Sequence, residues 1–391
     1  MSTANTSSKL SRPLHKNVVL IAGEASGDFY AGDLITSLKK IHPDTHFSGM
    51  AGSHAETAGM KLWYDYSSFS TMGWTEALRN YRKYYTLQQD LQNQILAQNP
   101  DLLILIDYAG LNLRLAKFAH EHNITCLYYI PPKVWAWNKK RIHKLRRYAN
   151  NIAVLYPFEA TFFRGENLPV SLILHPLSQK LEYAHPPVGM GKNIAILPGS
   201  RKSEIDIILP IQLASCYALK LKHKTPLHFF IFLSDSSQTL RIQRTVMAWR
   251  DKLDISLIPT AQKYDTLKKC HAALAMSGTI TVELALLGIP HIILGKLALI
   301  NYLMYLCVYS QKWVGLPNLI MQKSIIPELK QYECSEAKIV AHLEAILFTQ
   351  QGVLMRQDLL EMRTRLTNTK TAVPIESLVS NILYGLTYAP S

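Results

Sequence analysis

Residues 193–204, NIAILPGSRKSE, join an apolar strand to a loop suited to bind an anion. The run 194–197 is typical of a buried parallel strand, and the Pro-Gly pair that follows ends it. Gly199 permits a tight turn that brings backbone N–H groups close to a ligand, while Ser200 and Arg201 can hydrogen-bond phosphate oxygens. A helix expected from about Ser203 would add its positive N-terminal end. The alternative is an ordinary strand-to-helix turn with a solvated arginine.

A second hydroxyl-rich turn follows the apolar run 272–275. Ser277, Gly278 and Thr279 are expected to open a helix there, which could complete a diphosphate site. Glu283 lies one turn further and could accept hydrogen bonds from both hydroxyls of a ribose. The alternative is a Ser/Thr cap with a surface glutamate. That interpretation is weaker because the residues around Glu283 are apolar and would bury it.

A carboxylate ends the apolar run 102–106, where another buried strand is expected. Open α/β sheets bind ligands at the carboxyl ends of their strands, so Asp107 is well placed for acid–base chemistry. An equally open interpretation is that Asp107 caps a helix expected from Leu113.

The N-terminal apolar run 17–22 predicts the first strand, and GEASGD (23–28) follows as a small-residue loop before a helix expected over 30–40. Glu24, Ser26 and Asp28 place polar groups at the same edge of the sheet. Ser26 or Asp28 could instead cap the helix. A cap would not explain Glu24.

Residues 66–85 mix aromatic and basic side chains and include Phe69, Met72 and Trp74. This composition fits a membrane interface or a cleft for lipid chains. The alternative is an amphipathic helix that faces the core.

Residues 139–147 form the densest basic segment of the chain and contain no acidic residue. Clustered cations of this kind favour contact with phosphate or anionic lipid, although a solvated helix face is the simpler alternative. The candidate contact residues are Lys139, Lys140, Arg141, Arg146 and Arg147.

Apolar runs of strand length alternate with helix-length segments along the chain. They cover residues 17–22, 46–50, 102–106, 125–129, 152–155 and 170–174, and then 193–197, 227–233, 255–258, 272–275 and 291–294. This alternation predicts an α/β fold with parallel sheets. The 391-residue length favours two domains, and the Pro- and Gly-rich stretch 185–192 is the expected linker.

Composition narrows the class of protein. Apolar residues make up 48% and charged residues 18%, which is typical of a globular protein. The five cysteines have no metal-ligand spacing, so we expect reduced thiols, no metal site and a cytoplasmic protein. Residues 1–16 are polar and lack the apolar core of a signal peptide. The net charge of +14 favours an anionic partner.

Six motifs occur in an order and at a spacing that resembles the lipid-A-disaccharide synthase family: GEASGD, IDYAGLN, PPKVWAW, LPGSRKSE, SGTITVE and GLPNLI. The resemblance covers nearly the whole chain. It implies an α/β fold of the GT-B glycosyltransferase type, with two Rossmann-like domains, a cleft between them and a C-terminal helix that crosses back to the first domain. The implied boundaries are a leader at 1–16, an acceptor domain at 17–184, a UDP-sugar domain at 185–355 and returning helices at 356–391.

The activity implied by the resemblance is that of an inverting hexosyltransferase of lipid A biosynthesis. It would join UDP-2,3-diacylglucosamine to 2,3-diacylglucosamine 1-phosphate (lipid X), forming a β(1→6) disaccharide and UDP. Asp107 is the first candidate for the base that removes the acceptor proton, and Glu24 is the second. The motifs add Asn112 to the acceptor loop and Asn318 to the UDP site.

The resemblance has two departures. Leu174-His175-Pro176 stands where the family has Gly-His-Pro, and Ala109 and Leu111 stand where it has a proline and an aromatic residue. The first could alter the hinge between the domains, and the second the stiffness of the loop after Asp107.

The expected partners are the two lipid substrates and the anionic inner face of the inner membrane, with no cofactor and no nucleic acid; a homodimer stays open. The competing enzyme interpretation is a related transferase or 2-epimerase acting on UDP-N-acetylglucosamine. The competing class is a non-catalytic basic protein that binds nucleic acid or membranes, against which the two anion-binding loops argue.

Overall fold

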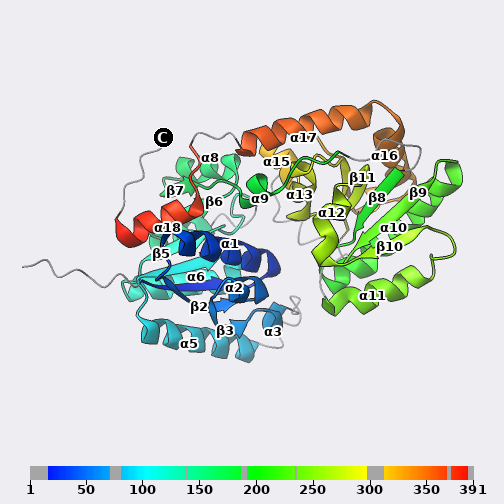
Figure 1. The fold of residues 1–391 in the computed structure, drawn as a ribbon. Helices are drawn as coiled ribbons and strands as arrows, with labels where there is room; N and C mark the ends of the chain where they lie inside the picture. Colours follow the sequence, from blue (N-terminus) through cyan, green and yellow to red (C-terminus); the bar gives the residue numbers. More distant parts are fainter. Residues whose placement is uncertain are drawn as a thin grey trace, which may run out of the picture.

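A computed structural model describes residues 16–70, 81–136, 140–185, 192–233, 236–296, 312–367 and 371–385. Met72, Trp74 and Lys139 lie outside the described residues, as does the side chain of Phe69. The described residues form two parallel sheets, each with helices packed around it, that lie side by side (Figure 1). The expected α/β fold with two Rossmann-like domains is confirmed.

The first sheet has the strand order β3-β2-β1-β4-β5-β6-β7. Its central strands have the sequences NVVLIA and LLILI and are almost wholly buried, as is typical of a parallel sheet covered on both faces. The edge strand β3, KLWYD, has an apolar run of only three residues, all partly exposed, and is the strand of this sheet that the sequence did not predict. The strands are β1 (Asn17–Ala22), β2 (His46–Ala51), β3 (Lys61–Asp65), β4 (Leu102–Ile106), β5 (Cys126–Tyr129), β6 (Asn151–Val154) and β7 (Val170–Leu172).

Two helices of the first domain begin earlier than expected. Helix α1 (Ala25–Ile41) begins directly after Glu24, because the small residues of GEASGD already form its first turn. Helix α6 (Ala109–Glu121) begins directly after Tyr108 rather than at Leu113. The other helices of this domain are α2 (Ser53–Thr57), α3 (Ser67–Ser70), α5 (Tyr81–Gln98), α7 (Arg141–Tyr148), α8 (Pro157–Gly165) and α9 (Pro176–Lys180).

The second sheet has the order β10-β9-β8-β11-β12-β13 and is also parallel. Its strands are β8 (Lys192–Leu197), β9 (Leu227–Phe232), β10 (Ile255–Ile258), β11 (Ala272–Met276), β12 (His291–Gly295) and the short, unexpected β13 (Glu328–Lys330). Its helices are α10 (Lys202–Lys222), α11 (Ser236–Met247), α12 (Lys263–Leu267), α13 (Ile280–Leu286), α15 (Leu316–Met321) and α16 (Glu336–Phe348), with short 3-10 turns at Thr260–Gln262 and Gln331–Glu333.

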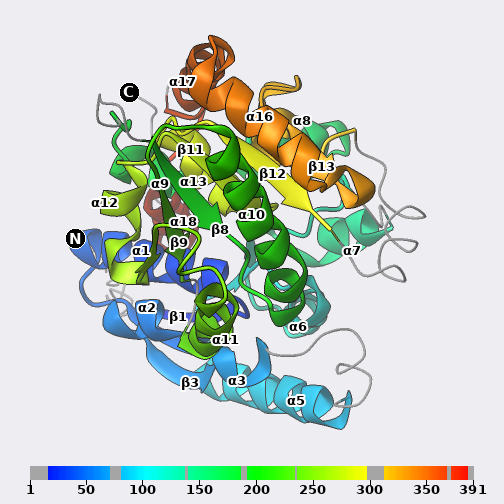
Figure 2. The same cartoon turned by 90° about the vertical axis from the view of Figure 1, so that its right-hand side faces the viewer.

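The chain crosses back to the first domain through α17 (Gln351–Thr367). This helix packs on α13, α15 and α16 of the second domain and on α9 of the first (Figures 1 and 2). The chain then pairs with the end of the first sheet, where the N–H of Leu174 donates to the carbonyl oxygen of Val373 at 3.0 Å. Helix α18 (Ile375–Tyr384) packs on α1. The expected crossing helix is confirmed, although the boundary expected at residue 356 falls inside α17.

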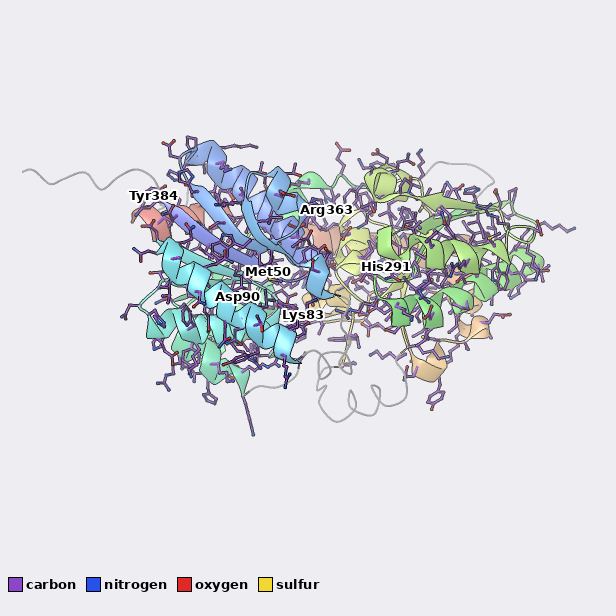
Figure 3. The ribbon with its side chains drawn as sticks, turned by 90° about the horizontal axis from the view of Figure 1, so that it is seen from below. Met50, Lys83, Asp90, His291, Arg363 and Tyr384 are labelled. Carbon is purple, nitrogen blue, oxygen red and sulfur yellow. The ribbon has the colours of Figure 1, made fainter. Side chains whose placement is uncertain are left out.

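Arg363, on α17, joins the two domains directly. Its guanidinium donates to the carbonyl oxygen of Leu286 at 2.6 Å, in the second domain, and to that of Ser178 at 3.5 Å, in the first. Figure 3 shows Arg363 between the first domain, which carries Met50, and the second, which carries His291. The crossing helix therefore helps to fix the sites of the two domains relative to each other.

The helices that the structure describes are all too short or too polar to span a lipid bilayer.

Candidate active site

Arg201 connects the two halves of the candidate site. It follows β8 and precedes α10, and its guanidinium lies 3.9 Å from the carboxylate of Glu24 and 3.5 Å from that of Glu204. Glu24 belongs to the first domain and Glu204 to the second. The loop expected to bind phosphate is thus brought opposite the carboxylates at the end of the first sheet, as the resemblance implied.

Glu204 already uses two backbone N–H groups of the phosphate-binding loop. Its Oε2 accepts hydrogen bonds from the N–H of Ser200 at 3.1 Å and of Arg201 at 3.2 Å. Gly199 has a φ of +110°, and a Cβ there would lie 2.6 Å from the same oxygen, so the turn requires glycine. These two N–H groups do not face a ligand, contrary to the expectation. The anion-binding groups that this turn offers are the Arg201 guanidinium and the Ser200 hydroxyl.

The turn Ser277-Gly278-Thr279 lies at the adjacent strand end, before α13. A side chain at Gly278 would meet no atom within 4 Å, so the turn faces open space. Thr279 is exposed, and Ser277 is half-buried. The turn is therefore accessible to a ligand beside the Arg201 loop, although the helix that it opens has only seven residues.

Glu283 is buried, with 8% of its surface exposed, as the sequence predicted. Its Oε2 lies 2.5 Å from the Lys263 ammonium and accepts a hydrogen bond from the Tyr264 hydroxyl at 3.0 Å. These contacts fix the side chain and occupy one oxygen. The expected contact with two ribose hydroxyls therefore depends mainly on Oε1.

Asn318 does not point to a ligand. Its Nδ2 donates to the carbonyl oxygen of Ile326 and to the Glu328 carboxylate, both at 2.8 Å. Its Oδ1 accepts from the N–H groups of Ile325 at 2.8 Å and Ile326 at 3.0 Å. Two donors and two acceptor sites are the full capacity of an amide side chain. Asn318 therefore holds the turn before β13, and its expected contact with UDP is wrong in this conformation.

Asp107 stands in an unusual backbone conformation. Its φ is +47° and that of Tyr108 is +45°, a left-handed region that costs free energy for residues other than glycine and is often found at functional sites. The carbonyl oxygen of Asp107 accepts hydrogen bonds from Asn112 Nδ2 and the Tyr128 hydroxyl, each at 2.9 Å. These contacts hold the strained turn in place and leave the Asp107 carboxylate to other partners.

Asn112 is a supporting residue rather than an acceptor contact. It is fully buried, and its Nδ2 also donates to the carbonyl oxygen of Ile106 at 3.0 Å. Asn112 thus belongs to the loop after Asp107, as the motifs predicted, and its burial keeps it from direct contact with an acceptor. Asp107 does not occupy the N-cap position of α6 either, since that position belongs to Tyr108, whose side chain makes no capping hydrogen bond.

The carboxylates of Asp107 and Glu24 influence each other. Burial raises the pKa of Asp107, and the charges of Lys133 and Arg201 partly offset this effect. Burial is also the main cause that raises the pKa of Glu24, followed by repulsion from Asp107, while Arg201 and Lys133 lower it. Raised carboxyl pKa values suit a general base that works near neutral pH.

Asp28 caps a neighbouring helix and does not face the acceptor. It is buried, its Oδ1 accepts from the N–H groups of Gly52 at 2.8 Å and Ala55 at 3.0 Å, and its Oδ2 accepts from that of His54 at 3.0 Å. The cap interpretation was right in kind, but the helix is α2 rather than α1. Ser26 lies half-buried in the first turn of α1, beside Glu24.

Sequence reasoning missed two residues near Asp107. Lys133, within PPKVWAW, is exposed, and its charge lowers the pKa of Glu24, Asp107 and Glu159. Glu159 is buried on α8 and accepts a hydrogen bond from Trp135 Nε1 at 3.0 Å. A signal for Glu159 was present, because a single acidic residue within YPFEATFF would be buried by its neighbours, as was argued for Glu283.

The described cations of the basic segment differ in their surroundings. Arg146 donates to the carbonyl oxygen of Glu166 at 2.6 Å, and burial lowers the pKa of the half-buried Arg141. Lys140 and Arg147 are exposed. Ile142 on α7 is buried, so the segment is an amphipathic helix with a basic outer surface. This arrangement is compatible both with contact to phosphate or anionic lipid and with a solvated helix face.

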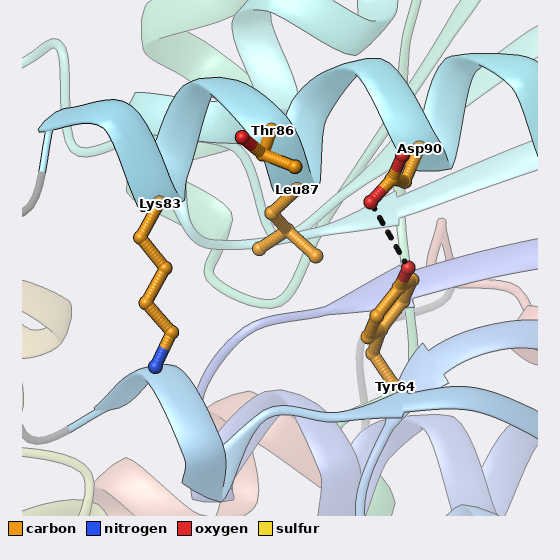
Figure 4. A pocket seen from close by; sticks show the side chains of 5 residues that line it. All are labelled: Tyr64, Lys83, Thr86, Leu87 and Asp90. Atoms are coloured by element: carbon orange, nitrogen blue, oxygen red, sulfur yellow. Dashed lines mark hydrogen bonds between the residues drawn. The ribbon is translucent and has the colours of Figure 1, made fainter.

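A small groove lies on the first domain between β3 and α5 (Figure 4). The Tyr64 hydroxyl donates to Asp90 Oδ2 at 3.3 Å across it. None of the expected site residues lines this groove; its lining residues are Tyr64, Lys83, Thr86, Leu87 and Asp90.

Solved structures share the fold. A UDP-N-acetylglucosamine 2-epimerase from Neisseria meningitidis bound to UDP-GlcNAc has a TM-score of 0.58 and 12% identity, covering 94% of this chain and 97% of that one. The spinosyn rhamnosyltransferase SpnG has a TM-score of 0.58 and 10% identity, covering 94% of this chain and 99% of that one. Together with the two parallel sheets and the crossing helix, these similarities establish the GT-B fold.

Curated relatives identify the family. Lipid-A-disaccharide synthase 1 of Legionella pneumophila (strain Philadelphia 1) is 33% identical over 341 residues, which is 85% of this chain and 88% of the relative. Lipid-A-disaccharide synthase of Nitrosococcus oceani is 34% identical over 340 residues, which is 84% of this chain and 86% of the relative. A family model described as lipid-A-disaccharide synthetase matches residues 18–381. The chain therefore belongs to the lipid-A-disaccharide synthase family of glycosyltransferases.

Proposed function

We propose that this chain transfers 2,3-diacylglucosamine from its UDP derivative to lipid X, giving the β(1→6) disaccharide 1-phosphate and UDP. Family membership supports the reaction class. The observation in the structure that supports the proposal most directly is the contact of Arg201 with Glu24. It places a guanidinium that can bind the donor diphosphate beside a carboxylate that can act as the base. The acceptor would lie on the side of the first domain, and the nucleotide on the side of the second.

The acceptor side supplies the base. The primary hydroxyl of lipid X attacks the anomeric carbon of the donor sugar, and Asp107 takes its proton as the new C–O bond forms. Asp107 is preferred because its turn is held by Asn112 and Tyr128, so that its position is fixed. Glu24 is the alternative base, and Arg201 partly neutralises its charge in the free protein.

The donor side supports the leaving group. As the bond from the anomeric carbon to the diphosphate breaks, negative charge grows on the diphosphate oxygens. The Arg201 guanidinium, the Ser200 hydroxyl and the turn Ser277-Gly278-Thr279 would stabilise that charge. Glu283 would accept a hydrogen bond from the ribose. We expect no cofactor, with Arg201 as the main counter-charge.

We also propose that the protein works as a peripheral protein on the inner face of the inner membrane. Both substrates carry acyl chains, and the exposed Lys140 and Arg147 could each contribute about 1 kcal/mol near an anionic surface. Trp74 and its aromatic neighbours could add apolar insertion. In a sedimentation assay, binding of the protein to anionic vesicles should therefore weaken at high salt, where charge contacts are screened, but should persist. Complete loss of binding at high salt would remove the aromatic part of this proposal.

Release of UDP on addition of acceptor tests the reaction class. The protein should release UDP from UDP-2,3-diacylglucosamine only when lipid X is present, and the Arg201→Ala variant should release it far more slowly. Conversion of UDP-N-acetylglucosamine without any acceptor would instead favour the epimerase interpretation. Tight polynucleotide binding without affinity for UDP would favour the non-catalytic class.

A further inference from the structure

Glu159 is a buried carboxyl group to which the proposed mechanism gives no task. It lies in the first turn of α8 with 5% of its surface exposed, and it forms no ion pair within 4 Å among the described residues. Burial of a carboxyl group without a close cation is costly, so a specific reason for its position is expected.

The partner of Glu159 is the loop that follows β5. Trp135 Nε1 donates to Glu159 Oε1 at 3.0 Å, and the Trp135 ring packs edge-on against Phe158 at 5.0 Å between centroids. The loop turns tightly, because the N–H of Ala136 donates to the carbonyl oxygen of Lys133 at 2.9 Å. The indole is buried, whereas Lys133 is exposed. Glu159 therefore anchors the turn that presents Lys133.

The same loop contacts the base candidate through the backbone. The N–H of Asp107 donates to the carbonyl oxygens of Tyr129 at 3.3 Å and Ile130 at 3.2 Å, where β5 passes into the loop. Strands β4 and β5 are neighbours, with Ile106 paired to Tyr129. Anchoring of the loop by Glu159 is thus transmitted to the turn that carries Asp107.

The charged and titratable groups that act on Glu159 come from several elements. Its pKa is raised to about 7, mainly by burial and also by the charge of Asp107, while the Trp135 hydrogen bond, the Lys133 charge and the Tyr156 N–H partly offset this rise. Tyr30 and Tyr156 also sense its charge. Electrostatic effects between two groups are reciprocal. An ionised Glu159 therefore repels the Asp107 carboxylate and favours uptake of a proton by Asp107.

We propose that Glu159 is a positioning residue for the transfer: through Trp135 it fixes the loop beside Asp107, and its negative charge strengthens Asp107 as the base. This inference rests on the proposed function, with Asp107 as the proton acceptor. A simple helix cap does not account for the site, because a cap needs neither burial nor the indole contact.

The test is the pH dependence of disaccharide formation by four proteins: wild type, Glu159→Gln, Trp135→Phe and Glu166→Gln. Glutamine can still accept the indole and backbone hydrogen bonds but carries no charge. Glu166→Gln is the matched control, since Glu166 is a half-buried glutamate at the C-terminal cap of the same helix and pairs with Arg146, away from Trp135. Initial rates are measured from about pH 5.5 to about pH 9, which brackets the ionisation of Glu159.

The ratio of the wild-type rate to the Glu159→Gln rate should be close to one at acid pH. It should rise to about three- to tenfold above about pH 8, where Glu159 is ionised and repels the Asp107 carboxylate. Trp135→Phe should be slower than the wild type at every pH, because the loop is less firmly held. Its rate should still change with pH near neutrality, because the charge of Glu159 is kept. Glu166→Gln should match the wild type.

A constant ratio over the whole range would overturn the proposal, since a purely structural role lowers the rate equally at every pH. A Glu159→Gln rate equal to the wild type at every pH would overturn it as well. If the wild type forms no disaccharide, the proposed function itself fails, which is a distinct outcome.

Discussion

The guanidinium of Arg201 in the second domain lies 3.9 Å from the carboxylate of Glu24 in the first. Both side chains are accessible, with 68% and 42% of their surfaces exposed, so the pair itself contributes only about 0.2–1 kcal/mol. A contact this weak can be exchanged for a stronger one with phosphate. The two residues therefore mark the place where a nucleotide held by the second domain would meet the carboxylates of the first.

Replacing Arg201 with alanine should weaken UDP binding by roughly 1.5–3 kcal/mol, the range for a charge-assisted hydrogen bond. Arg201→Lys should recover part of the affinity, because lysine keeps the charge but cannot form the two-pronged contact. Isothermal titration calorimetry with UDP measures both. Unchanged affinity in folded Arg201→Ala would remove Arg201 from the site.

Asp107→Asn should spare UDP binding and lower turnover by roughly 100-fold or more, because general base catalysis is lost while the shape of the side chain is kept. Glu24→Gln is the comparison for assigning the base. Single-turnover rates with lipid X measure the effect. Near-normal turnover in Asp107→Asn together with a collapse in Glu24→Gln would transfer the role of base to Glu24.

Asp28→Ala should lower the free energy of unfolding by roughly 1.5–3 kcal/mol, because the N–H groups of Gly52, His54 and Ala55 lose their acceptor. UDP affinity should not change at temperatures where the variant is folded. Urea denaturation and calorimetry give the two quantities. A stable variant with a raised KM for lipid X would return Asp28 to the acceptor site.

Glu159→Gln should change how stability depends on pH. Burial raises the pKa of Glu159 from 4.5 to about 7, so between these values the folded protein holds a proton that the unfolded chain releases. The wild type should therefore lose stability relative to Glu159→Gln as pH rises from 4.5 to about 7, by about 3 kcal/mol in total. Urea denaturation of both proteins across this range measures the difference. A pH-independent difference would mean that the carboxyl titrates normally.

The sequence predicted the strands that form the middle of each sheet, since buried parallel strands are short apolar runs ended by glycine or polar residues. It missed β3 and β13, which lie at sheet edges and lack fully buried apolar runs. It also placed the starts of α1 and α6 too late, because small residues in GEASGD and after Tyr108 were taken as loop although they form the first helical turn.

The sequence predicted the location of those site residues that directly follow a buried strand, because the carboxyl ends of parallel strands meet at one edge of the sheet. The contact of Arg201 with Glu24 agrees with that reasoning. Asp28 and Asn112 were assigned to the acceptor loop and Asn318 to the UDP site, but all three are hydrogen-bonded within the protein. Their partners come from other segments, such as the turn after β2 for Asp28, and a linear pattern does not contain this information. For Glu159 the apolar neighbours in YPFEATFF indicated burial, but its partner Trp135 lies in a different segment and could not be predicted.

The central claim is that this chain joins two acylated glucosamine units through the sites around Arg201 and Asp107. Mass spectrometry of the products from a chemically defined UDP-2,3-diacylglucosamine and lipid X tests it most directly. The predicted result is one new species with the mass of the tetraacylated disaccharide 1-phosphate, formed together with one equivalent of UDP and formed roughly 100-fold or more slowly by Asp107→Asn. Hydrolysed donor alone, or a rearranged monosaccharide without any disaccharide, would contradict the account.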